Sequence, residues 1–218
     1  QDIVEAVDDE MGDDYAKLAG LTAEEDLNET LPQSIKKRLP WLIVLLFLGM
    51  IVSSVVGAFE SAVAVIPIVM CFQSLILDMA GNVGTQSLAV TIRVLMDETL
   101  TGRQKAELVL KEMRIGLCNG GLLGILSFVL IGLYIFLFKG KTLVFAYAVS
   151  GCIGLSLLVA MLVSSAVGTC IPLFFKKVGV DPAVASGPLI TTMNDLVAVI
   201  TYYGMSWIFL IEMFHLAG

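Results

Sequence analysis

The chain has 218 residues, of which 57% are hydrophobic and 15% charged, and its mean hydropathy is +0.91. This composition excludes an ordinary soluble domain, because the apolar residues form long runs without charge, which is typical of membrane spans. The formal net charge of −7 is unevenly placed, since residues 1–31 contain eleven acidic residues and one basic residue.

Residues 1–36 form an acidic segment ahead of the apolar runs. Asp9 and Asp13 share one face of a predicted helix with Asp2 and Glu5, and Asp14 lies beside them. The segment lacks the basic start and early apolar stretch of a signal peptide. Because the chain begins with glutamine rather than methionine, we expect it to be part of a longer protein.

Five apolar runs follow and predict an all-α membrane protein with five transmembrane helices. The longest run, Thr142–Phe175, has thirty-four residues without a charge, so we predict one span that ends in a turn at Pro172. Residues 93–114 predict a cytoplasmic helix between the second and third spans, with a capping box formed by Thr101 and Gln104. The predicted membrane domain covers residues 37–218, with spans at 41–59, 62–90, 115–138, 143–171 and 182–211.

The basic residues predict the orientation of these spans. Eleven lysines and arginines lie before the first span or in the loops that share its starting side, and two lie on the other side. Basic loops stay in the cytoplasm. We therefore expect a multi-pass protein of the cell membrane with a cytoplasmic N-terminus and an extracytoplasmic C-terminus.

The last span keeps one charge, Asp195, near its middle. A charge at the centre of a bilayer costs about 2.5–3.5 kcal/mol on insertion scales, so it is retained where it faces water, a partner or an ion. Pro188, Thr191 and Thr192 lie on the same helical stripe as Asp195. This pattern favours a functional site over the alternative, a buried aspartate bonded to a neighbouring helix.

The second span also has polar residues on one face of an otherwise apolar helix. Asp78, Asn82 and Gln86 are four residues apart and share a face, and Gly81 and Gly84 flank Asn82. Glycine lets a backbone loosen or another helix approach closely. The alternative is a face of small packing residues on which the two amides join helices.

Together the two spans offer carboxylates and neutral oxygens. Such hard donors favour Mg²⁺, Ca²⁺ or Mn²⁺ over Zn²⁺ or Cu²⁺, and an ion with few carboxylate ligands keeps much of its water, as Mg²⁺ does. The four cysteines show no metal-binding spacing and the single histidine, His215, is expected at the membrane interface. The residues alone therefore predict a path for a divalent or monovalent cation.

Two long motifs resemble the MgtE family of magnesium channels and transporters. VDPAVASGPLITTMND at 180–195 is similar to its last-span signature, and LDMAGNVGTQSLAVTIR at 77–93 to its second-span signature. The likeness extends over residues 8–214. It implies a homodimer whose ion path is lined by the second and fifth spans of both copies, and upstream N-terminal and CBS domains that this chain does not contain.

The resemblance also implies roles for single residues. Asp195 matches the carboxylate that holds hydrated Mg²⁺, and Thr191 the position whose carbonyl faces that ion. Asn82 and the glycines beside it match the pore wall of the second span, and Glu60 an acidic residue at the outer turn. We therefore expect Asp195, Thr191, Asn82 and Asp78 to contact the ion, and the path to be lined by Gly81, Gly84, Gln86, Thr192 and Pro188. The chain has Ala80 before Gly81 and Ser74 before Asp78, where the family often has glycine and proline, which puts the bend and pore width of this span in doubt.

The resemblance gives the acidic segment a role as a gate that closes when internal Mg²⁺ binds at Asp9, Asp13 and Asp14, so Mg²⁺ is expected both as transported ion and as gating ligand. The plain alternative is a solvated charged linker. We expect no enzymatic activity and no nucleic-acid partner. Two other functions stay open: a coupled antiporter of Mg²⁺ against Na⁺ or H⁺ and, more remotely, an intramembrane aspartyl protease using Asp78 and Asp195.

Overall fold

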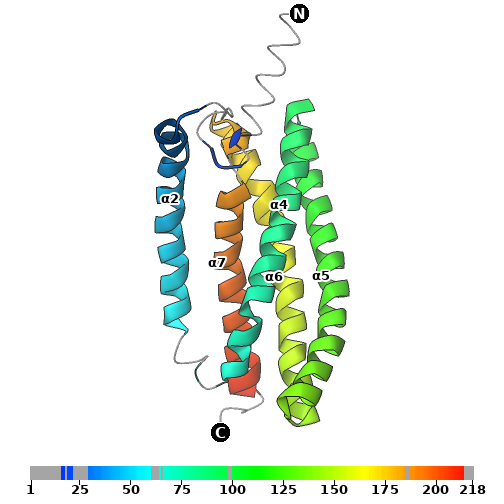
Figure 1. Cartoon of the computed structure of the whole chain (residues 1–218). Coiled ribbons are helices and arrows are strands. Elements are labelled where there is room, and N and C mark those ends of the chain that lie inside the picture. The colour runs from blue at the N-terminus through cyan, green and yellow to red at the C-terminus, as the bar shows by residue number, and fades with distance from the viewer. Residues whose placement is uncertain are drawn as a thin grey trace, which may run out of the picture.

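The computed structural model describes residues 16–17, 19–21, 29–59, 64, 66–97, 100–184 and 187–213, and all regular elements within them are helices. Five helices are long and apolar enough to cross a membrane, which confirms the expected number. They are α2 (Leu31–Ala58), α4 (Gln73–Asp97), α5 (Gly102–Lys139), α6 (Leu143–Lys177) and α7 (Gly187–Ser206), and they run alternately up and down (Figure 1). Short 3₁₀ helices, η1 (Pro67–Phe72) and η2 (Pro182–Val184), precede α4 and α7, and a π-helix, η3 (Trp207–Met213), continues α7.

Helix α5 begins at the predicted capping box. The backbone N–H of Gln104 donates to Thr101 Oγ1 at 3.4 Å, and the backbone N–H of Thr101 donates to Gln104 Oε1 at 2.9 Å. The helix then runs unbroken to Lys139 and ends before Gly140, whose φ is 61°. The prediction of a cytoplasmic helix at residues 93–114, ahead of the third span, is therefore wrong, because residues 102–114 belong to the same helix as that span. Charged residues mark where a helix leaves the apolar layer, but the helix itself can continue past that point.

Helix α6 runs through Pro172 to Lys177, so the turn predicted at Pro172 is wrong as well. Proline removes one hydrogen bond to the carbonyl four residues before it, and membrane helices tolerate this loss where neighbouring helices pack around the site. Pro172 is buried in the bundle, as this explanation requires.

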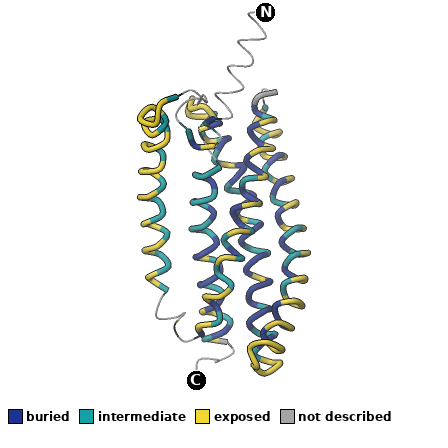
Figure 2. The backbone as a smooth tube through the Cα atoms, viewed as in Figure 1, coloured by how far each residue is buried: buried dark blue, intermediate teal, exposed yellow. Residues whose placement is uncertain are grey.

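The bundle is built around α6, which packs against α4, α5 and α7 and is the most buried of the five helices (Figure 2). Helix α2 lies at the edge, packs chiefly on α7, and has no buried residue. An apolar helix with its surface exposed fits a bilayer, where lipid covers what water would expose.

Glycines bring α5 and α6 together backbone to backbone. A Cβ on Gly124 would lie 2.6 Å from the Gly154 carbonyl oxygen, and one on Gly120 would lie 2.8 Å from Leu158 Cα. Such small-residue contacts are typical of membrane helices. As a result α5 is held by α6 and packs little against α4.

Tyrosines near the end of α7 hold η1 at the start of α4. The Tyr202 hydroxyl donates to the Val69 carbonyl at 2.8 Å, and the Tyr203 hydroxyl donates to Gln73 Oε1. Both rings are buried. These bonds fix the beginning of α4 relative to α7, and hence the register of the two helices that carry the polar motifs.

Candidate functional site

The two polar motifs lie on neighbouring helices, because α4 packs against α7 through its glycines. A Cβ on Gly81 would lie 3.2 Å from Thr191 Cγ2, and one on Gly84 would lie 1.7 Å from Asn194 Nδ2. Gly84 also touches α6, since a Cβ on Gly168 would lie 2.2 Å from the Gly84 carbonyl oxygen. The helices α4, α6 and α7 therefore meet at Gly84.

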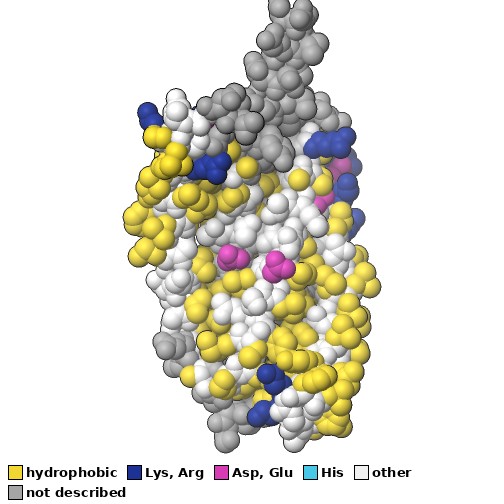
Figure 3. Space-filling view, in the orientation of Figure 1, with side chains coloured by type: hydrophobic (Ala, Val, Ile, Leu, Met, Phe, Trp, Pro, Cys, Tyr) yellow, Lys and Arg dark blue, Asp and Glu magenta, His cyan; other side chains and the backbone are white. Residues whose placement is uncertain are grey.

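The polar stripe of α4 lies away from this contact. Asp78, Asn82 and Gln86 are all exposed, and Asp195 on α7 is partly exposed. Figure 3 shows two acidic groups near the middle of one face, surrounded by apolar and uncharged side chains, with the other charged groups, mostly basic, toward its ends. The two helices thus place carboxylates at membrane depth on an open surface of the bundle.

The other residues predicted for the ion path contribute mainly to helix structure. Thr191 is partly buried against Gly81, and the Thr192 hydroxyl donates to the Pro188 carbonyl at 2.9 Å. Gly81 and Gly84 are both buried. Their place along a pore wall stays a prediction.

The chemistry of the donors fits an ion that keeps its water. Among the described residues no group of three or more histidine, cysteine, aspartate or glutamate side chains could enclose a bare metal ion. Carboxylates of Asp78 and Asp195, with neutral oxygens beside them, suit contact with bound water molecules. Mg²⁺ is the ion that dehydrates most reluctantly among those considered.

Asn194 was not identified from the sequence. Its side chain is fully buried, and neither Oδ1 nor Nδ2 has a hydrogen-bond partner in the described part of the chain. A signal was present, because Asn194 follows Ile190 and precedes Ala198 by four residues each and so shares their packing face. The residue next to Asp195 therefore anchors α7 while Asp195 itself lies toward the open face.

A second polar contact that the sequence did not predict joins α4 to α5. Ser87 Oγ donates to Glu112 Oε2 at 3.0 Å, and the two residues are 3% and 4% exposed. A buried carboxylate is costly unless it is hydrogen-bonded. Here it links two helices that otherwise pack little against each other.

Two described residues of the acidic segment, Lys17 and Gly20, pack where α7 begins. Lys17 Nζ lies 2.9 Å from Asp181 Oδ2, and a Cβ on Gly20 would lie 2.5 Å from Trp41 Cδ1 and 3.3 Å from Pro188 Cγ. Gly20 has φ 82°, a conformation that favours glycine. Burial alone would raise the pKa of Asp181, but hydrogen bonds from Lys17 and the Ala183 amide outweigh it and lower this pKa. Asp9, Asp13, Asp14 and Glu60 lie outside the described residues.

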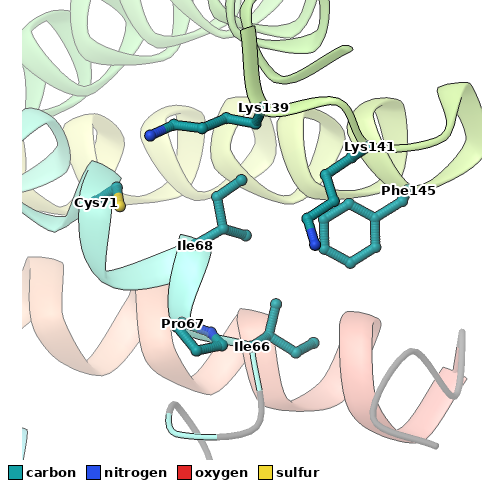
Figure 4. Close-up of a pocket in the computed structure, with 7 residues that line it drawn as sticks. All are labelled: Ile66, Pro67, Ile68, Cys71, Lys139, Lys141 and Phe145. Atoms are coloured by element: carbon teal, nitrogen blue, oxygen red, sulfur yellow. The ribbon is translucent and has the colours of Figure 1, made fainter.

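A pocket of about 460 Å³ lies at the opposite end of the bundle, between η1 and the α5–α6 connection (Figure 4). Lys139 and Lys141 are on its wall with Cys71, and its described lining contains no carboxylate. Two cationic side chains make this pocket unsuited to a divalent cation.

Comparison with known proteins agrees with this chemistry. The sequence profile of the MgtE family, described as divalent cation transporter, matches residues 73–205. Proteins named magnesium transporter MgtE from Enterococcus faecalis, Bacillus subtilis and Thermus thermophilus are 39%, 34% and 30% identical over 96%, 96% and 94% of this chain. The chain spans 44% of the length of each of these relatives.

Proposed function

The chain belongs to the MgtE family of divalent cation transporters, and on that premise we propose that it carries Mg²⁺ across a cell membrane as a dimeric, Mg²⁺-gated channel. The observation that carries the proposal is that Asp78, Asn82 and Gln86 of α4 are exposed and that Asp195 of the neighbouring helix α7 is partly exposed. The reaction is movement of an ion, with no covalent step.

The cost of exposing carboxylates to lipid supports a water-filled path between two copies of the chain. Carboxylates facing lipid would cost several kcal/mol, and the cost disappears when they face a water-filled cavity. A second copy that presents the same face would enclose such a cavity along a twofold axis. Asp78 and Asp195 would then act on the ion through its bound water, and the membrane potential would drive its entry.

Contacts of the acidic segment support the gating part. Lys17 and Gly20 of this segment lie against Asp181, Trp41 and Pro188, where α7 begins. Mg²⁺ among Asp9, Asp13 and Asp14 would relieve their repulsion and favour this packed arrangement, so ion binding would shift the equilibrium toward a closed path. In the full-length protein, the upstream N-terminal and CBS domains would share this ion binding.

The charges of the connections support the orientation. The start of α2, the α4–α5 connection and the α6–α7 connection lie at the same end of the bundle (Figure 1). These segments contain most of the lysines and arginines. That end would face the cytoplasm.

The test is Mg²⁺ uptake into liposomes that contain the purified chain, under an imposed voltage. We expect uptake by the wild type and a loss of about tenfold or more in Asp195→Asn, because hydrogen bonds to a charged group contribute about 1.5–3 kcal/mol. Glu107→Gln removes an exposed carboxylate of α5 and should leave uptake unchanged.

Uptake by Asp195→Asn equal to that of Glu107→Gln would contradict the proposal. Repeating the assay with and without Na⁺ and H⁺ gradients separates a channel from an exchanger. Channel flux follows voltage and persists without either gradient, whereas flux of an exchanger stops.

A further inference from the structure

A second polar feature is a cavity of about 410 Å³ between α4, α5 and α6. Its polar side chains are three primary amides: Asn82 and Gln86 from α4 and Asn119 from α5. The rest of the described lining is apolar, including Met79, Leu122 and Met161. We refer to this space as the amide cavity.

The cavity results from the way α5 is held. Gly116 and Gly120 press α5 against Ser165 and Leu158 of α6, so α5 follows α6 and leaves space beside α4. Asn119 lies between these glycines in the sequence and seven residues after Glu112. Glu112 contacts α4, because its carboxylate accepts a hydrogen bond from Ser87. Two helical turns separate Glu112 from Asn119, so both lie on the side of α5 that faces α4.

The amides are available to a ligand. Each offers a carbonyl acceptor and two N–H donors, and no hydrogen bond joins any of the three to another described residue. Polar groups at membrane depth require a polar partner. A polar occupant therefore stabilises this cavity better than an acyl chain would.

The chemistry of the lining selects the occupant. Neutral amides cannot replace the full water shell of a divalent ion, but their carbonyl oxygens accept hydrogen bonds from its bound water. Six water molecules at about 30 Å³ each need roughly 180 Å³, which is less than the volume of the cavity. Asp78 also lies one turn before Asn82 on the same exposed stripe, so an ion at the carboxylate is next to the amides.

We propose that the amide cavity receives the hydrated divalent cation and that Asn119 is a specificity-determining residue of the path, contributed by α5. This inference deepens the proposed function and rests on it, because it concerns the same ion. It adds a third helix to the two that the polar motifs identified.

The first test measures selectivity in liposomes that contain the full chain. Asn119→Leu removes the amide and should raise the Mg²⁺ concentration for half-maximal uptake about fivefold, the effect of one hydrogen bond. It should also weaken block by hexaamminecobalt(III), an inert mimic of a hydrated cation. Asn119→Gln should restore both values, and Ser127→Ala, a polar truncation elsewhere on α5, should change neither.

The second test does not depend on transport and measures whether a charged reagent and a hydrated-cation mimic reach position 119. In a chain whose other cysteines are alanine, a charged thiol reagent should modify Asn119→Cys quickly, and hexaamminecobalt(III) should slow that reaction. Native Cys118 is the matched control, because it is exposed on α5 but does not line the cavity. Its reaction should be slow and unaffected by the cobalt complex.

The outcomes separate the two proposals. Loss of uptake in Asp195→Asn together with wild-type selectivity in Asn119→Leu would overturn the amide cavity and leave the channel intact. If the wild type carries no Mg²⁺, the thiol reaction still decides: equal rates at the two positions, or no protection by the complex, would overturn the inference.

Discussion

Asn194 of α7 occupies the space that Gly84 of α4 leaves open, and a Cβ on Gly84 would lie 1.7 Å from Asn194 Nδ2. The contact joins the residue beside Asp195 to the centre of the second-span motif. Because Asn194 is fully buried and Asp195 is not, the rotation of α7 that buries the amide is the rotation that exposes the carboxylate. The two glycine-rich and polar motifs thus depend on each other for their geometry.

Gly84→Ala should disturb this arrangement. The added methyl group would displace the Asn194 amide, and overpacking of this kind costs about 1–3 kcal/mol. We expect a lower midpoint of unfolding in a denaturing detergent and reduced Mg²⁺ uptake, because α7 must shift. Gly121→Ala is the matched control, since a Cβ there would meet nothing within 4 Å, and equal behaviour of the two variants would argue against the contact.

The buried pair of Ser87 and Glu112 predicts a coupled effect on stability. Ser87→Ala leaves a buried carboxylate oxygen without its donor and should cost about 1–3 kcal/mol of unfolding free energy. Replacing both residues, by Ser87→Ala with Glu112→Leu, should cost less than the sum of the single changes, because no unpaired acceptor remains. Unfolding midpoints of the four proteins measure the coupling, and strict additivity would mean that the hydrogen bond contributes nothing.

The contact between Lys17 and Asp181 predicts how the packing of the acidic segment depends on pH. The pKa of Asp181 is lowered in the folded chain, so its stabilisation is fully present above the ordinary aspartate pKa of about 4 and is lost as pH falls through the lower, folded value. Fluorescence of Trp41, against which Gly20 packs, should therefore stay constant between about pH 5 and 8 and change only in more acidic solution.

In Asp181→Asn, the fluorescence at neutral pH should already resemble that of the acidic state. Trp207→Phe removes the second tryptophan of the chain and isolates the signal of Trp41. A transition near neutral pH in the Trp207→Phe protein would show that another group controls this contact.

The helical elements could be predicted because a charge in lipid is costly. Charge-free runs gave five spans, and the serial four-residue spacing of Asp78, Asn82 and Gln86 correctly placed the three on one exposed face. The capping box of Thr101 and Gln104 was also correct, since it depends only on local sequence.

Features that depend on a neighbouring helix could not be predicted. Nothing local shows that α6 continues through Pro172, because the packing that tolerates the lost hydrogen bond comes from other helices. The same holds for the burial of Asn194 against Gly84 and for the cavity that Asn119 lines, because both depend on how α4 packs against other helices. Roles for the acidic segment and Glu60 remain predictions.

The absence of any buried residue in α2 has a consequence for how the protein is made. Its main partner is α7, the last of the five helices, so α2 leaves the ribosome long before that partner exists. Until α7 is made, lipid can cover α2 in its place, so α2 can enter the bilayer first and set the direction in which the later helices are threaded. Helices α4 and α7 carry the polar motifs and pack on α6, which is made after α4, so the two motifs are expected to come together late in biogenesis.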